Sequence, residues 1–145
     1  MAQVSTYLNF MGKTKEAFEF YKSIFGTEYE APIQYMKDVP SDPNMPPLAD
    51  EEKEMVMHVS LPILDGHVLM GTDMLKSMGH QLKLGNNMSI NVMPDTLEET
   101  KRLFTALSEG GSEVMGLQQM FWGDTFGTFV DKFGIRWMFN CSAKE

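Results

Sequence analysis

Hydrophobic residues recur along this chain with two periods, one typical of helices and one typical of strands. From residue 15 to residue 25 they occupy every third or fourth position, which predicts a helix with one apolar face that ends at Gly26. That face comprises Ala17, Phe20, Tyr21, Ile24 and Phe25. Aromatic and β-branched residues in segments 3–10 and 28–36 predict a strand on each side of the helix.

The next region combines a long loop with a pair of strands. Residues 38–53 contain four of the seven prolines, end in an acidic run and show no apolar period. A loop of this length is usually a lid, a binding loop or a disordered segment, and the sequence leaves these alternatives open. Residues 54–61 and 67–73 then predict two strands joined by a turn at Asp65-Gly66.

The second half of the chain repeats the order of the first. After a connector at residues 74–86 and a strand, a capping-box pattern from Thr96 to Glu99 marks the start of a helix that stops before Gly110. The predicted strands of this half cover residues 87–93, 112–120, 125–131 and 135–141. Each half therefore has the order strand, helix, strand, strand, strand.

Similarity between the two halves indicates a duplication. Aligning Thr6 with Ser89 also superimposes the apolar faces of the two helices, and beyond the proline-rich loop a second alignment matches Met70 with Met138. The shift between these alignments is about the length of the loop, which we interpret as an insertion. We therefore predict one α+β domain with two βαβββ modules, with the domain at 1–145, the modules at about 1–73 and 87–145, and the connector at 74–86.

Several short motifs carry a family resemblance over nearly the whole chain. They are Tyr7–Phe10 (YLNF), Glu16–Gly26 (EAFEFYKSIFG), Met57-His58, Gly66–Gly71 (GHVLMG), Phe121–Gly123 (FWG) and Asp131–Trp137 (DKFGIRW). Together they resemble the PhnB-like branch of the vicinal-oxygen-chelate superfamily, which contains glyoxalases, bleomycin-resistance proteins and dioxygenases. The resemblance implies two curved βαβββ halves that form a partly closed mixed sheet around a cavity, with the helices outside. Proteins of this branch are sometimes labelled ubiquinone-pathway methyltransferases, but the sequence has no glycine-rich loop between a strand and a helix for a nucleotide cofactor.

Metal enzymes of this superfamily bind their metal through His, Gln or Glu on the first and last strands of each half. The resemblance places these positions at Thr6, Met70, Ser89 and Met138. Catalytic zinc, nickel, manganese or iron needs imidazole or carboxylate ligands at three or four positions, and a shift of one residue supplies none. We therefore expect no metal and no other cofactor.

A few other side chains are candidates for chemistry. His58 lies in mid-strand and is either a half-buried structural histidine or a cavity-facing general base or hydrogen-bond donor. Asp124 is a candidate to orient either His58 or a polar group of the ligand. Trp122 lies in an aromatic cluster at a glycine turn and either walls a pocket or packs at the barrel rim or in a dimer interface. Arg136 shares a strand face with Met138, so it binds an anion if that face lines the cavity and is otherwise a surface ion-pair residue.

Composition and charge narrow the choice of partners. The 145 residues carry a net charge of −8 and an isoelectric point of about 4.8. This disfavours nucleic acid and anionic membranes, because both require a basic surface. The single cysteine, Cys141, and a first segment without a long apolar run predict a cytoplasmic protein. The 14 methionines form either a methionine-rich core or the lining of a ligand cavity.

Two classes of function are compatible with these features. The first is a small-molecule-binding protein, with a cavity lined by Thr6, Met70, Ser89, Trp122, Arg136 and Met138. The alternative is a lyase, isomerase or dioxygenase of the glyoxalase type that acts on a small carbonyl or oxygenated substrate. It is either metal-dependent or metal-free, with His58 and Asp124 in proton transfer on a carbonyl or amine compound. The missing metal ligands favour binding or metal-free catalysis, and the sequence does not separate these two. We expect a homodimer in either case.

Overall fold

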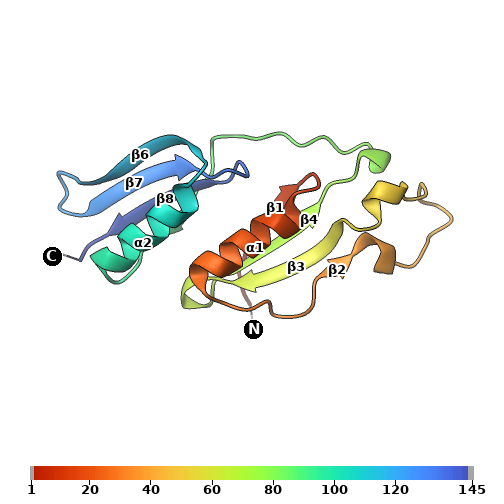
Figure 1. Cartoon of the computed structure of the whole chain (residues 1–145), viewed down its shortest axis with the longest axis horizontal. Coiled ribbons are helices and arrows are strands. Elements are labelled where there is room, and N and C mark those ends of the chain that lie inside the picture. The colour runs from red at the N-terminus through yellow and green to blue at the C-terminus, as the bar shows by residue number, and fades with distance from the viewer. Residues whose placement is uncertain (1, 144–145) are drawn as a thin grey trace. The chain divides into compact units, whose positions relative to one another are not determined.

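The computed structural model describes residues 2–143, which form two compact units with the same element order (Figure 1). The units are Met1–Lys83 and Leu84–Glu145, so their boundary falls within the predicted connector. In each unit one α-helix packs on one face of a four-stranded sheet. No helix in the described part of the chain is long and apolar enough to cross a membrane.

Unit 1 has a mixed sheet of order β1-β4-β3-β2. β1 runs parallel to β4, whereas β3 pairs antiparallel with both β4 and β2. The elements are β1 (Thr6–Phe10), α1 (Thr14–Phe25), β2 (Gln34–Tyr35), β3 (Val56–Pro62) and β4 (Val68–Asp73). Short 3-10 helices lie at Met36–Asp38, Asp50–Glu52, Leu64–Gly66 and Lys76–Met78.

Unit 2 has a sheet of the same topology, in the order β5-β8-β7-β6. β5 runs parallel to β8, and the remaining pairs are antiparallel. The elements are β5 (Ile90–Val92), α2 (Leu97–Ser108), β6 (Ser112–Gln119), β7 (Thr125–Val130) and β8 (Arg136–Cys141). The matching topologies confirm the prediction of an α+β fold built from two βαβββ modules.

The helix α1 buries a face that differs slightly from the predicted one. The buried residues are Thr14, Ala17, Phe18, Tyr21 and Ile24. The prediction had Phe20 and Phe25 in place of Phe18, yet both are only half-buried. Phe18 fits against the sheet because Gly71 on β4 has no side chain, and a β-carbon at Gly71 would lie 2.5 Å from the Phe18 ring. The buried face of α1 is therefore set partly by a glycine on a distant strand.

The predicted strand at residues 28–36 is wrong for most of its length. Only Gln34–Tyr35 pair with β3 as a strand. Before them, a backbone hydrogen bond of 3.0 Å from Glu30 N to Ser60 O reaches the sheet. Pro32 has no N–H to donate to a ladder, so regular pairing does not extend through it.

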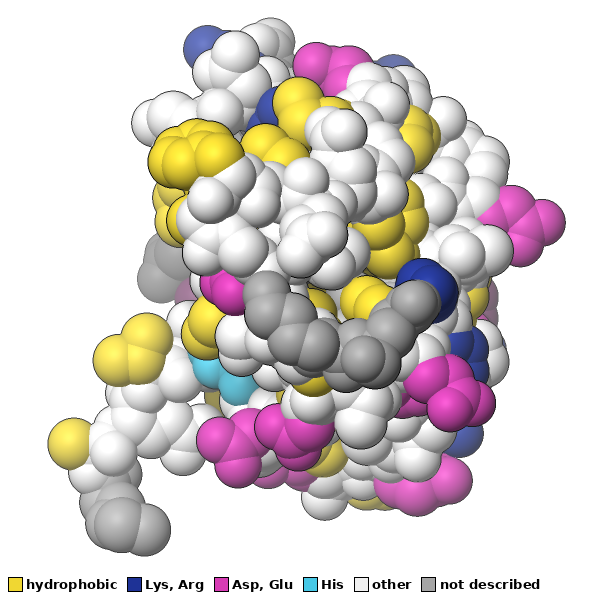
Figure 2. Space-filling view, turned by 90° about the vertical axis from the view of Figure 1, so that its left-hand side faces the viewer, with side chains coloured by type: hydrophobic (Ala, Val, Ile, Leu, Met, Phe, Trp, Pro, Cys, Tyr) yellow, Lys and Arg dark blue, Asp and Glu magenta, His cyan; other side chains and the backbone are white. Residues whose placement is uncertain are grey.

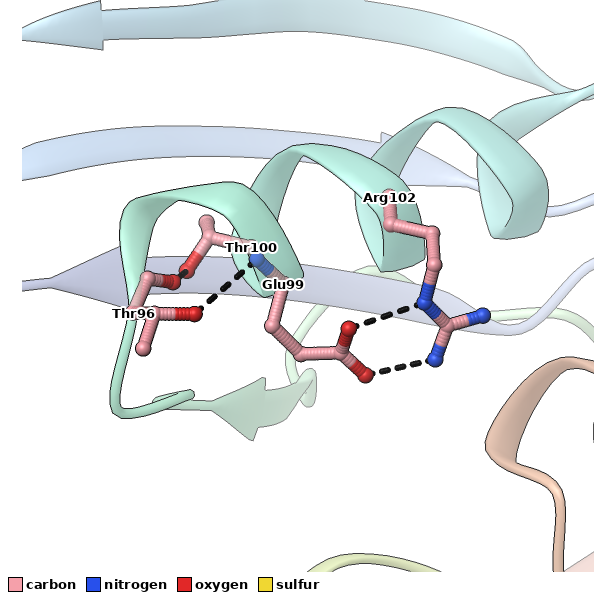
Figure 3. A network of polar contacts seen from close by, with 4 residues as sticks. All are labelled: Thr96, Glu99, Thr100 and Arg102. Atoms are coloured by element: carbon pink, nitrogen blue, oxygen red, sulfur yellow. Dashed lines mark hydrogen bonds and ion pairs between the residues drawn. The ribbon is translucent and has the colours of Figure 1, made fainter.

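The helix α2 begins after Thr96, as predicted (Figure 3). The Thr96 hydroxyl accepts a hydrogen bond of 3.1 Å from the Glu99 backbone N–H. The Glu99 carboxylate turns instead to Arg102, whose Nε and Nη2 donate to it at 2.8 and 2.5 Å. The N-cap is therefore formed by the threonine, and the glutamate forms a two-pronged ion pair on the helix surface.

The proline-rich loop is tied at its end to the turn that follows β4. Glu52, which is buried, accepts hydrogen bonds from Ser77 Oγ at 2.5 Å, from Ser77 N at 3.1 Å and from Ala49 N at 3.2 Å. The side-chain hydrogen bond from Ser77 is the main cause that lowers the pKa of Glu52 from its usual value. The ionised carboxylate is thus the form that holds the two segments together.

Candidate functional site

The face of the unit 1 sheet opposite α1 carries a group of polar side chains. Side chains alternate along a strand, so the buried Leu8 and Phe10 point toward α1 whereas Tyr7 points the other way. The register places Met70 of β4 beside Tyr7, and Ser60 of β3 beside Met70. We call this surface the unit 1 open face; it comprises Tyr7, Asn9, His58, Ser60, Met70 and Thr72.

Tyr7 and His58 form a hydrogen-bonded pair on this face. The Tyr7 hydroxyl lies 3.1 Å from His58 Nδ1, and the ring centroids are 5.8 Å apart. Because β4 lies between β1 and β3, the Tyr7 side chain extends across β4 to reach His58. Tyr7 remains 48% exposed, and partial burial raises the pKa of its phenol, which therefore stays protonated near neutral pH. Within the described residues of unit 1, His58 Nε2 has no hydrogen-bond partner and is available to a ligand as donor or acceptor, according to the tautomer.

Most other hydroxyl groups on the unit 1 open face are already engaged. The Ser60 hydroxyl donates to the Glu30 carboxylate, and Thr72 Oγ1 donates to the Met57 carbonyl at 2.7 Å. These contacts use both hydroxyl groups, whereas the Tyr7–His58 pair keeps hydrogen-bonding capacity of its own.

Thr6, which the resemblance grouped with Met70, lies on the other side of the sheet from it. The register pairs Thr6 with Leu69, which is fully buried, and pairs Tyr7 with Met70. The Thr6 hydroxyl lies 2.8 Å from Nε2 of His67. Of the adjacent residues on β1, Tyr7 is therefore the one that shares the unit 1 open face with Met70.

Unit 2 presents an equivalent face with different chemistry. One row of paired residues crosses its four strands and consists of Asn91, Met138, Thr128 and Met115. We call the surface around this row the unit 2 open face. Ser89, the predicted counterpart of Thr6, precedes β5 and lies outside the paired strand, whereas Asn91 is the β5 residue beside Met138. In both units the methionine of the last strand lies on the open face, with a different neighbour from the one expected.

Trp122 lies at the β6–β7 turn and contacts this face. Its Nε1 donates to Asn140 Oδ1 at 3.3 Å, and Asn140 Nδ2 donates to Asp124 Oδ2 at 2.8 Å. The Trp122 ring packs edge-on against Phe121 and Phe126, with centroids 5.0 and 5.6 Å apart. Trp122 is 45% exposed and Phe121 is 96% exposed. Figure 2 shows, in yellow, that exposed hydrophobic side chains form several separate patches on the surface.

The two predicted catalytic residues each have a partner within their own unit. His58 is hydrogen-bonded to Tyr7, and Asp124 is hydrogen-bonded to Asn140. Asp124 thus orients an amide that in turn accepts from Trp122. The pairing of His58 with Asp124 stays a prediction, whereas the pairing of His58 with Tyr7 is a contact that sequence reasoning did not find.

Arg136 lies at the start of β8, on the same strand face as Met138 by alternation. Its Nη1 lies 3.4 Å from Glu113 Oε2 on β6. The two side chains are 28% and 66% exposed, so the ion pair is screened by solvent and contributes little to stability.

The residues at the expected metal positions do not fit a metal ion. The open faces offer a phenol and a thioether from Tyr7 and Met70, and an amide and a thioether from Asn91 and Met138. Zinc, iron, nickel and manganese are held in proteins mainly by imidazole, carboxylate or thiolate ligands. Within either unit, over residues 2–143, no three His, Cys, Asp or Glu side chains come close enough to hold a metal ion. We therefore derive no metal-dependent step for this chain.

The duplicated βαβββ architecture with one helix outside each sheet defines the class of protein. It is the fold of glyoxalase/bleomycin-resistance/dioxygenase proteins: a domain of this class from Frankia sp. EAN1pec superposes with a TM-score of 0.64, at 10% identity, over 99% of this chain and 94% of that chain. The family to which the chain belongs is a narrower group than this fold class. The profile of the 3-demethylubiquinone-9 3-methyltransferase family matches residues 2–139, and the chain belongs to this family.

Other relatives agree with this assignment and confirm the PhnB-like resemblance of the sequence motifs. Protein PA1353 from Pseudomonas aeruginosa is 35% identical, with a TM-score of 0.84 over 99% of this chain and 100% of that chain. The PhnB protein from Bacillus cereus is 27% identical, with a TM-score of 0.74 over 97% of this chain and 99% of that chain. Protein YjdN of Escherichia coli K12 is 27% identical over 141 residues, which cover 94% of this chain and 93% of its own.

The family name refers to methyl transfer, but the first strand-to-helix loop does not suit a nucleotide cofactor. Such a cofactor needs free backbone N–H groups at a helix N-terminus. Here the buried carboxylate of Asp73 already accepts from Gly12 N at 2.8 Å, from Thr14 N at 3.2 Å and from Thr14 Oγ1 at 2.7 Å. Its second oxygen accepts from Val56 N at 2.9 Å. An anionic group of a cofactor at this loop would have to displace a carboxylate that holds α1, β3 and β4 together.

Proposed function

We propose that the chain binds a small, partly apolar organic molecule and that the Tyr7–His58 pair recognises a polar group on it. The hydrogen bond between the two side chains, 3.1 Å long and on a half-exposed sheet face, carries this proposal. It orients the imidazole while leaving Nε2 available, and the phenol keeps an acceptor lone pair. A carbonyl or hydroxyl group on the ligand matches these donors and acceptors.

Methionine supplies an apolar contact for the ligand on the unit 1 open face, and the unit 2 open face, considered separately, carries apolar side chains of its own. Met70 lies beside Tyr7 on the unit 1 open face. On the unit 2 open face, Met138 is half-buried and Trp122 is half-exposed. Thioethers adapt to irregular shapes and make favourable contacts with aromatic rings, so such surfaces suit a ligand with an apolar portion.

Metal-free proton transfer is a second candidate function, favoured by the same pair. Histidine is the usual general base near neutral pH, and a hydrogen-bonded tyrosine can orient it or return a proton. The carbonyl compound that the pair would bind is also the type of compound from which a base can remove an adjacent proton. The two functions differ in one respect, which is whether the bound molecule is converted.

Binding is tested with a panel of small aldehydes, ketones and phenols that includes 4-hydroxybenzaldehyde, followed by NMR of the His58 ring protons. We expect some members to shift these signals saturably. Tyr7→Phe and His58→Gln should weaken that binding about three- to tenfold, the effect of losing one hydrogen bond. His80→Gln is the matched control, because His80 is exposed in the connector and accepts from Leu75 N.

The proposal is wrong if no compound shifts the His58 signals, or if both variants bind as tightly as His80→Gln. The same spectra report on turnover. Conversion of a bound compound by the wild type, with binding but no conversion in His58→Gln, would establish proton transfer. A compound that stays unchanged over hours would establish binding alone.

A further inference from the structure

Unit 2 contains a hollow of about 770 Å³ that is not lined by the residues proposed above to recognise the ligand. It lies between the end of α2, the start of β6, the β7–β8 turn and the segment 84–86. The residues that matter for its chemistry are Glu113, Asp131, Lys132 and Arg136. Neither Met138 nor Trp122 lines it, and all of its walls belong to unit 2.

Arg136 makes weaker ion-pair contacts than Arg102, the other arginine of the chain. Its contact with Glu113 is a single one at 3.4 Å, and the carboxylate is 66% exposed. Arg102 on the same unit, by contrast, meets Glu99 through two nitrogen atoms at 2.8 and 2.5 Å (Figure 3). A guanidinium has five N–H donors and binds a carboxylate or phosphate best through two of them at once. Arg136 therefore retains donors for a second oxyanion.

Glu113 reaches Arg136 from an unfavourable backbone conformation. Its φ is 49°, in the left-handed region that costs a non-glycine residue energy, and the register of β6 with β7 is irregular between Ser112 and Met115. A strained, exposed carboxylate with one long contact is a weak partner. It is the kind of internal anion that an external one can replace.

The other charged groups of the hollow leave room for an anion. Asp131 lines it, but Oδ1 accepts from the N–H groups of Phe133 and Ile135 at 2.8 and 3.0 Å, and Oδ2 accepts from Trp137 Nε1 at 2.9 Å. The oxygen atoms of this carboxylate are therefore already hydrogen-bonded to three donors of unit 2. Lys132 adds a second cation to the wall.

We propose that this hollow binds a small oxyanion, the carboxylate or phosphate group of a metabolite, through Arg136, and that Glu113 is displaced when the anion binds. The site is independent of the Tyr7–His58 pair. Because Glu113 competes with the ligand for Arg136, its removal should strengthen binding.

The test uses the full chain with inorganic phosphate and, separately, acetate, at low ionic strength. Binding is followed through the backbone amide signals of residues 112–113 and 132–136 in NMR spectra. We expect saturable shifts, about tenfold weaker binding in Arg136→Gln, and about threefold to tenfold tighter binding in Glu113→Gln. Arg102→Gln is the control, because it removes an equal charge from the same unit away from the hollow. Thermal melts confirm that each variant is folded.

Each outcome decides the proposal. Shifts with phosphate alone identify a doubly charged oxyanion, and shifts with acetate identify a carboxylate. No shift with either anion overturns the proposal. So does an Arg136→Gln variant that loses no more affinity than Arg102→Gln, or a Glu113→Gln variant that binds no more tightly than the wild type.

Discussion

A single methyl group added at Gly111 tests how closely β6 is held against β7. A β-carbon at this position would lie 2.2 Å from the Val130 carbonyl oxygen, 3.1 Å from the Ser108 carbonyl oxygen and 3.2 Å from the Asp131 α-carbon. All three neighbours are backbone atoms, so no side chain can rotate away. Gly111→Ala therefore forces the start of β6 to move away from β7.

The size of the effect follows from these distances. Non-bonded heavy atoms normally stay about 3.5 Å apart, so the chain has to shift by about 1.3 Å. A shift of this size breaks the 2.9 Å hydrogen bond from Gly111 N to Ser108 O and the first pairing of β6, Ser112 with Val130. Each of the two hydrogen bonds contributes about 1 kcal/mol, overpacking adds about 1 kcal/mol, and the stiffer unfolded chain returns about 0.5 kcal/mol. We expect the free energy of unfolding to fall by about 2.5 kcal/mol and the melting temperature by about 5–10 °C.

The control is the same substitution a few residues further along β6. Gly116 has no atom within 4 Å of its ideal β-carbon, so Gly116→Ala should leave stability unchanged or raise it by up to about 1 kcal/mol. Urea unfolding of both variants, followed by far-ultraviolet circular dichroism, measures the difference. Equal free energies of unfolding for Gly111→Ala and Gly116→Ala would refute the close approach of β6 and β7.

Two further predictions concern side-chain hydrogen bonds. Thr96→Ala removes the acceptor for the Glu99 N–H and should cost about 1 kcal/mol in urea unfolding, whereas Thr96→Ser should cost much less; equal losses would contradict the N-cap role. Ser77 lowers the pKa of Glu52 in the folded chain from its usual 4.5, so the tie stabilises the fold above that value and is lost as the pH falls below it. Glu52→Gln should therefore be less stable than the wild type at pH 7 and lose less stability between pH 7 and pH 3; parallel curves would refute this.

Local sequence signals were sufficient to predict the order of the elements, but not all of their packing. Both helices begin within one residue of the predicted start, because apolar spacing and the Thr96 cap are local features. The buried face of α1 was partly wrong because the position of Phe18 depends on Gly71, which lies far away in sequence. The predicted strand at residues 28–36 is longer than the observed β2, because Pro32 interrupts regular pairing among aromatic and aliphatic neighbours that favour a strand.

The candidate site was predicted in part. The sequence singled out His58 but not its contact with Tyr7, because the pairing crosses an intervening strand that follows β3 in the sequence. The sequence did contain evidence for the orientation of Tyr7. Leu8 and Phe10 are apolar and alternate with Tyr7, so if they face the helix, Tyr7 lies on the opposite face of the strand. The alignment of Thr6 with Ser89 instead matched two small polar residues, neither of which lies beside the open-face methionine.

The chemistry available on each open face depends only on the residue types present within one unit. The methionines of β4 and β8 are at positions where the family resemblance led us to expect metal ligands, and their neighbours are a phenol and an amide. The imidazole of His58 and the carboxylate of Asp124 are each hydrogen-bonded to a neighbour in their own unit. Among the described residues of that unit, neither belongs to a group of three potential metal ligands. A thioether beside a hydrogen-bond donor is a poor ligand set for zinc or iron but a suitable contact for an organic molecule with one polar and one apolar part. For this reason we place the search for its function among small organic ligands.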